Sequence, residues 1–208
     1  MLKAPGYRAL ILKLLYHLSQ EDKLKATFTY TECIPLVYQL IIHCPEPIVG
    51  KELIALAVNL TTNPRNAEII AQDDQHECLI ERAFKFRDTL LFKVCRNIAQ
   101  FFPESISTLE KYMDRYIELA HHADEYTDLL LELLGTMVYI PTDLWAEKIE
   151  KWNLIEFLHN HLMDGYAEDD ILLECVMLVG TICRNDEIAQ TIASSYLIKL
   201  LQDLLGAK

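Results

Sequence analysis

An apolar stripe recurs along the chain about every forty residues, and this repetition constrains the fold more than any other feature. In residues 129–140, LLLELLGTMVYI, the apolar side chains fall on one face of a helix. Four other stretches carry the same pattern. Their last apolar residues, used as anchors, are Leu18, Leu60, Ile98, Met137 and Ile182, so the spacings are 42, 38, 39 and 45 residues. A period near 40 residues is typical of helical solenoids, which present extended binding surfaces.

A second pattern lies beside the stripe. The positions three, four and seven residues before each anchor are apolar in all five copies, and together with the anchor they span about 100° of a helix. The position directly before the anchor is never apolar: it holds His17, Asn59, Asn97, Thr136 and Thr181. The sequence therefore predicts five long helices with a buried stripe and a polar neighbour row.

Breaks after each anchor divide the chain into units of a short, a medium and a long helix. Proline or aspartate stands four or five residues past every anchor, at Asp22, Pro64, Pro103, Pro141 and Asp186. These residues favour the first turn of a new helix. Long helices are expected at 4–19, 47–60, 87–101, 124–139 and 168–184, and medium ones at 31–43, 74–86, 109–122, 151–163 and 194–205.

Composition supports an all-α protein and separates two halves by charge. Hydrophobic residues make up 51% of the chain, with only 6 glycines, and leucine recurs at helical spacing. No uninterrupted apolar run is long enough for membrane insertion. Residues 1–104 contain 12 basic and 12 acidic side chains, whereas residues 105–208 contain 7 and 19, which accounts for the whole net charge of −12. Nucleic acid is therefore not an expected partner. The acidic half is interpreted either as a surface that attracts basic segments of other proteins or as a solubilising surface.

Catalytic and metal-binding patterns are weak. The six cysteines form no CxxC pair and are interpreted as reduced, mostly buried thiols. His159 and His161 are two residues apart, which places them on different sides of a helix. Glu168, Asp169 and Asp170 fit the start of a helix better than a cation site. We predict no enzymatic activity, no cofactor and no metal.

The one basic region consists of Arg82, Lys85, Arg87, Lys93 and Arg96. Two interpretations remain open: a solvated face balanced by nearby acids, or a contact for an acidic partner segment.

Several stretches of the sequence resemble known protein families, one broad and one narrower. Residues 56–70, LAVNLTTNPRNAEII, and 94–101, VCRNIAQF, resemble armadillo repeats. Residues 12–36, LKLLYHLSQEDKLKATFTYTECIPL, 90–100, LLFKVCRNIAQ, and 166–182, YAEDDILLECVMLVGTI, are similar to the kinesin-associated proteins, the non-motor subunits of heterotrimeric kinesin, the motor of cilia. Residues 43–50 and 101–108 depart from that family.

The resemblance implies an armadillo-type α-solenoid, a right-handed superhelix of three-helix repeats. Four complete repeats with partial repeats at both ends would form one domain over residues 1–208, within a longer array. It also implies an adaptor that binds motor-subunit tails and cargo adaptor proteins in the cytoplasm, at the cytoskeleton and cilium. The alternatives are another armadillo peptide receptor, for which tryptophans should adjoin the asparagines, or a regulator of a small GTPase.

In armadillo arrays the third helices line a concave groove, so the polar row is the candidate site for a basic or extended peptide. Positions one, five and eight before each anchor project within about 60° of one another. An asparagine amide there can pair with a peptide backbone, or it can satisfy carbonyl groups at its own helix end. The predicted site residues are Lys13, His17, Glu52, Asn59, Lys93, Asn97, Glu132, Thr136, Glu174 and Thr181.

Overall fold

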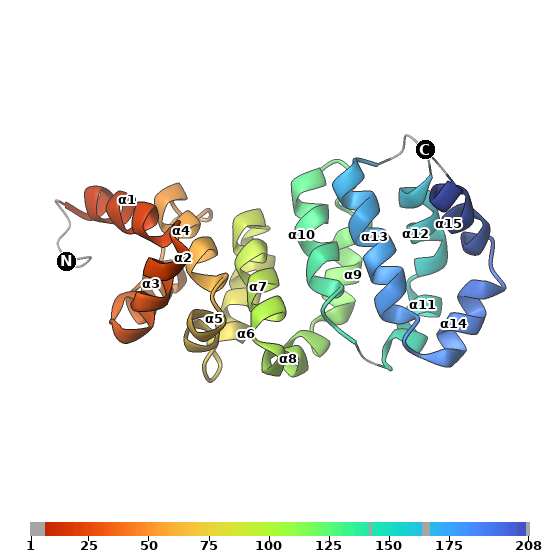
Figure 1. Ribbon diagram of the computed structural model, residues 1–208, viewed down its shortest axis with the longest axis horizontal. Coiled ribbons are helices and arrows are strands. Elements are labelled where there is room, and N and C mark those ends of the chain that lie inside the picture. The colour runs from red at the N-terminus through yellow and green to blue at the C-terminus, as the bar shows by residue number, and fades with distance from the viewer. Residues whose placement is uncertain (1–6, 142, 164–166, 207–208) are drawn as a thin grey trace. The chain divides into compact units, whose positions relative to one another are not determined.

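The computed structural model describes residues 7–141, 143–163 and 167–206, and every regular element within these ranges is helical (Figure 1). The chain divides into two compact units, residues 1–108 and 109–208. Within the described ranges, no helix combines the length and apolarity that crossing a bilayer requires. The predicted all-α class is confirmed, and the layered helices are consistent with an α-solenoid.

Unit 1 is built from layers of helices whose last members lie side by side. The first helix is α1 (Arg8–Ser19). The first complete layer consists of α2 (Asp22–Lys25) with the 3-10 helix η2 (Ala26–Tyr30), α3 (Cys33–Ile42) and α4 (Lys51–Thr61), and the second consists of α5 (Pro64–Ile70), α6 (Gln75–Phe86) and α7 (Thr89–Phe101). The next layer starts with η3 (Pro103–Ser105) and α8 (Ile106–Glu110). We call α1, α4 and α7 third helices. α4 packs between α1 and α7.

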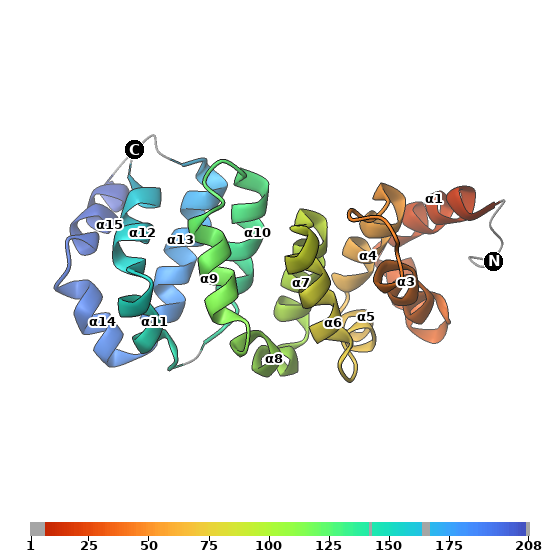
Figure 2. The same cartoon turned by 180° about the vertical axis from the view of Figure 1, so that it is seen from behind.

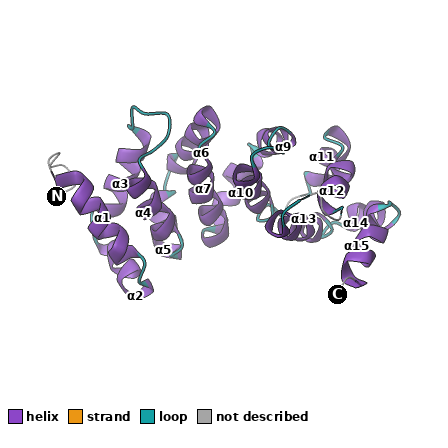
Figure 3. Cartoon of the chain, turned by 90° about the horizontal axis from the view of Figure 1, so that it is seen from above, coloured by secondary structure: helices purple, strands orange, loops and turns teal. Residues whose placement is uncertain are grey.

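Unit 2 repeats this order. Its helices are α9 (Met113–His121) and α10 (Thr127–Met137); α11 (Trp145–Lys151), α12 (Leu154–Leu162) and α13 (Asp169–Ile182); and α14 (Asp186–Ala193) and α15 (Leu197–Gly206). The third helices α10 and α13 pack against each other. We call the middle helix of each layer, such as α9 and α12, a second helix. α9 packs against α10 and α12 against α13, both on the same side of the α10–α13 pair, as the views from behind and from above show (Figures 2 and 3).

Short polar side chains start several of these helices. The Oδ1 atoms of Asn63, Asp88 and Asn185 accept hydrogen bonds of 3.2 Å from the amides of Asn66, Leu91 and Ile188. Such caps satisfy amides that a helix leaves without internal partners. The expected breaks are also confirmed at Asp22, Pro64 and Asp186, each of which is the first residue of a helix.

Several predicted helices are shorter than expected. The long helix predicted at 47–60 begins at Lys51, and the one predicted at 124–139 spans Thr127–Met137. The helix predicted at 109–122 is divided, because α8 ends at Glu110 and α9 begins at Met113. The helix predicted from residue 151 begins at Leu154, because Asn153 adopts a left-handed conformation with φ of 48°. Asparagine tolerates this conformation better than most residues, so an asparagine at this position was the sequence signal for a helix start at Leu154. Residues 4–6, predicted as helical, lie outside the described residues.

The apolar stripe forms the core of both units. In α4, α7, α10 and α13 the anchor and the positions three, four and seven before it are all buried. The predicted burial is wrong for the first copy: the side chains of Leu14 and Leu18 in α1 are 58% and 38% exposed. In α4 the corresponding stripe is covered by α3, the second helix of its own layer.

Candidate binding surface

In α4, α7 and α13 the polar residue before the anchor connects the helix to the previous third helix. The side-chain amide nitrogen Nδ2 of Asn97 in α7 donates to the Val58 carbonyl oxygen at 3.0 Å and to the Thr61 hydroxyl at 3.1 Å, both in α4. In the preceding pair, the Asn59 amide donates to the Ser19 hydroxyl of α1 at 3.1 Å. The asparagines therefore bind the end of the previous third helix.

Unit 2 shows the same contact with a shorter side chain. The Thr181 hydroxyl in α13 donates to the carbonyl oxygen of Val138, the residue that follows the anchor of α10, at 2.8 Å. Ser19 and Thr61 hold that same position, one residue past the anchors of α1 and α4. Thr136 instead donates to the Glu132 carbonyl oxygen of its own helix at 2.7 Å. The chemistry of this position varies, but in three helices it links successive layers.

Exposure varies strongly among the ten predicted site residues, which we call the third-helix row. Lys13, His17 and Glu52 are exposed, while Asn59 and Lys93 are half-buried. The other five are buried, with exposed fractions between 0% and 8%: Asn97, Glu132, Thr136, Glu174 and Thr181. The accessible part of the row therefore lies on the third helices of unit 1.

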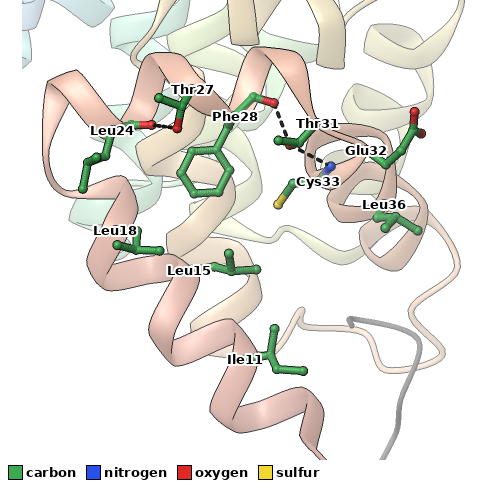
Figure 4. A pocket seen from close by; sticks show the side chains of 10 residues that line it. All are labelled: Ile11, Leu15, Leu18, Leu24, Thr27, Phe28, Thr31, Glu32, Cys33 and Leu36. Atoms are coloured by element: carbon green, nitrogen blue, oxygen red, sulfur yellow. Dashed lines mark hydrogen bonds between the residues drawn. The ribbon is translucent and has the colours of Figure 1, made fainter.

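An apolar hollow of about 380 Å³ opens in unit 1, between α1, α2 with η2, and α3 (Figure 4). The side chains of Ile11, Leu15 and Leu18 form its α1 wall, and Phe28 points into it from η2. The wall residues hold the stripe positions that α3 covers in α4. A hollow with this lining can accept apolar side chains. The sequence pattern did not indicate the hollow, because the pattern predicted that the stripe of α1 would be fully buried.

The predicted basic cluster is partly engaged within unit 1. Arg82 donates through Nη2 to the Glu46 carbonyl oxygen at 2.7 Å. The cations of Arg82 and Lys85 lie 4.8 and 5.0 Å from the centroid of the Phe86 ring. These side chains line a cavity of about 590 Å³ between the end of α3 and α6. Cation–π contacts order both cations without neutralising them.

The thiols do not have the surroundings of catalytic nucleophiles. Burial raises the pKa of Cys33 to about 11 and that of Cys175 to about 12. A thiol becomes a strong nucleophile when its pKa is lowered instead. Among the described residues, no three His, Cys, Asp or Glu side chains are grouped so as to hold a metal ion. His159 contacts Tyr196 and His161 contacts Asp124, so the two histidines have different neighbours.

The family described as Kinesin-associated protein (KAP) matches residues 1–208, the whole chain. The chain belongs to the kinesin-associated protein family. The resemblance seen in three phrases of the sequence is thereby confirmed over the full length, and membership associates this KAP chain with kinesin as an accessory protein.

The sequence did not reveal one polar network of this KAP chain. Asp114 in α9 accepts hydrogen bonds from the indole nitrogen of Trp152 at 2.7 Å and from Lys148 Nζ at 3.0 Å, and it lies 3.1 Å from Lys151 Nζ. Partial desolvation opposes ionisation, but these donors lower the pKa of Asp114 to about 2. The network joins α9 to the end of α11 across 34 to 38 residues of chain, and none of its residues belongs to the repeated stripe or to the polar row.

Proposed function

We propose that this chain is a non-enzymatic adaptor that holds tail segments of the motor subunits of heterotrimeric kinesin and links them to cargo. Membership of the kinesin-associated protein family carries the proposal. We further propose that its helical layers are armadillo repeats. The regular order of short, second and third helices, with third helices packed side by side inside each unit, supports that assignment.

The proposed contact surface is the third-helix row. Its exposed members Lys13, His17 and Glu52 would touch a partner segment directly. Its buried members, such as Asn97, would hold the helices in register beneath that segment. Transport in cilia is part of the same proposal.

A receptor for basic transport signals is less well supported. That function favours tryptophans beside the asparagines of the third helices. Trp145 instead begins α11 and donates from its indole nitrogen to the Ile140 carbonyl oxygen at 2.7 Å, while Trp152 is bonded to Asp114. Regulation of a small GTPase is separated from the adaptor function by a nucleotide-exchange assay.

The adaptor proposal is tested by capture of motor-subunit tails on the immobilised chain. We expect Lys13→Glu combined with Glu52→Lys to weaken capture by about fivefold or more, because complementary charges at a rim set association. Gln39→Glu changes an exposed position on the second helix α3 and serves as the control. Unchanged capture by the double variant would move the site away from the row, and failure of the unmodified chain to capture any tail would refute the adaptor proposal.

A further inference from the structure

A second, polar pocket lies in unit 2, away from the third-helix row. It has a volume of about 340 Å³ and is formed by the end of α9 and by α12, the second helices visible in Figure 2. Its lining consists of polar and aromatic side chains: His121, Asp124, Asn153, Glu156, Phe157, Asn160 and His161. No lysine or arginine is among them.

Two carboxylates define the charge of this pocket. Asp124 lies 3.3 Å from Nε2 of His161, measured at Oδ1, and its side chain is 51% exposed. Glu156 is exposed and accepts a hydrogen bond from the Asn153 amide. The His161 ring is fixed from its other side, because Nδ1 lies 2.9 Å from the Phe157 carbonyl oxygen. A cation entering the pocket would meet two accessible acids held by fixed neighbours.

The rings of His121 and Phe157 form another wall, and the Trp152 ring lies behind His121, outside the lining. The His121 ring lies 4.6 Å from the Phe157 ring between centroids, and 6.2 Å from the Trp152 ring at an interplanar angle of 27°. Burial lowers the pKa of His121 below its usual value, so this ring is uncharged at neutral pH. It therefore does not repel a cation, and it lines the pocket beside the Phe157 ring.

We propose that this pocket binds the guanidinium group of an arginine in a basic segment of a partner protein. A guanidinium is planar, stacks on rings and pairs with carboxylates through several N–H donors. Lysine fits less well, because a compact ammonium does not stack. A metal ion is disfavoured, because no suitable group of three ligands occurs in the described residues. Since the 19 acidic side chains of residues 109–208 exceed the 7 basic ones, the surrounding unit also attracts a basic segment.

This inference does not depend on the proposed kinesin function, since it concerns a different face and only the chemistry of the ligand. The test is an NMR titration of the full chain with the blocked tripeptide Ala-Arg-Ala, using amide shifts of residues 153–161 as the readout. We expect Asp124→Asn combined with Glu156→Gln to weaken binding by about tenfold, because charge-assisted hydrogen bonds are lost. Glu156→Gln alone, at an exposed position, should weaken it by about threefold without affecting folding.

Two matched controls keep the result specific. Glu187→Gln removes an exposed carboxylate from the first turn of α14, outside the pocket, and should leave binding unchanged. A tripeptide with citrulline in place of arginine keeps the shape but lacks the charge, and should bind at least about tenfold more weakly. Equal binding of the two tripeptides, or equal weakening by Glu187→Gln and Glu156→Gln, would overturn the proposal.

Discussion

Two residues with shifted pKa values, one buried and one partly exposed, contribute to the response of this protein to pH. His76 in α6 is 2% exposed, and neither of its ring nitrogens has a hydrogen-bond partner among the described residues. Burial therefore lowers the pKa of His76 to about 4. Asp114 behaves differently, because three donors stabilise its charge and lower its pKa to about 2. Both groups therefore make the folded chain less stable in acid, because the unfolded chain takes up their protons at a higher pH than the folded chain does.

We expect His76 to make the protein less stable in mild acid. In the unfolded chain a histidine titrates near 6.5, so the stabilisation is complete above that pH. It is lost as pH falls from about 6.5 to the folded value of about 4, because only the unfolded chain takes up the proton there. The loss at pH 4.5 should be about 2–3 kcal/mol.

Urea unfolding at pH 7 and pH 4.5 measures this loss. His76→Leu replaces the titrating ring with an apolar side chain that fills the same space. The urea midpoint of this variant should therefore fall less between pH 7 and pH 4.5 than the midpoint of the unmodified chain. Equal falls for the variant and the unmodified chain would show that His76 is not the responsible group.

At the scale of elements, hydrogen bonds from one third helix to the previous one align the layers. Asn97 is 8% exposed and donates to two acceptors of α4, whereas Asn59 is half-buried and donates to the Ser19 hydroxyl. The cost of leaving a polar group without a partner rises with its burial. The two bonds are therefore unequal in free energy, although the sequence places both residues at the same repeat position.

We predict that Asn97→Ala lowers the free energy of unfolding by about 1–3 kcal/mol, and that Asn59→Ala lowers it by about 1 kcal/mol or less. Asn97→Ala removes a hydrogen-bond donor and leaves the Val58 carbonyl group with one partner fewer. Chemical denaturation gives the values, with Gln100→Ala, an exposed position in the last turn of α7, as the control. The prediction fails if Asn97→Ala costs no more than the control.

At the scale of the whole molecule, charge is divided almost where the structure is divided. Residues 1–108 carry 12 basic and 12 acidic side chains, so unit 1 has no net charge. The net charge of −12 belongs entirely to residues 109–208. A basic partner is therefore attracted to unit 2, whereas contacts on unit 1 depend on individual exposed charges such as Lys13 and Glu52.

We expect capture of a basic motor tail to weaken as salt rises. The screening length falls from about 10 Å at 0.1 M to about 3 Å at 1 M salt, so the attraction of the acidic unit at a distance is removed. Binding measured between 50 and 500 mM salt should decrease steadily. Capture that is insensitive to salt would show that the charge of unit 2 does not drive it.

The repeat pattern predicted the helices well because local periodicity reports local structure. The third helices, the breaks at Pro64 and Asp186 and the core positions such as Leu133 follow from spacing alone. The ends of helices were predicted less accurately, because the side chain of Asp88 caps α7 and the left-handed backbone of Asn153 delays the start of α12. The polar pocket could not be predicted, because His121 and Phe157 lie 36 residues apart and neither belongs to the repeated positions.

The sequence by itself determined the all-helical class, the layered order of helices, the family and the charge of each half, because each depends on residue type and spacing along the chain. Only the tertiary structure decided which polar residues remain accessible. Asn59 and Asn97 hold the same repeat position, yet the neighbouring helix leaves one half-buried and buries the other. Accessibility depends on what packs against a side chain, and that is a property of distant segments brought together by folding.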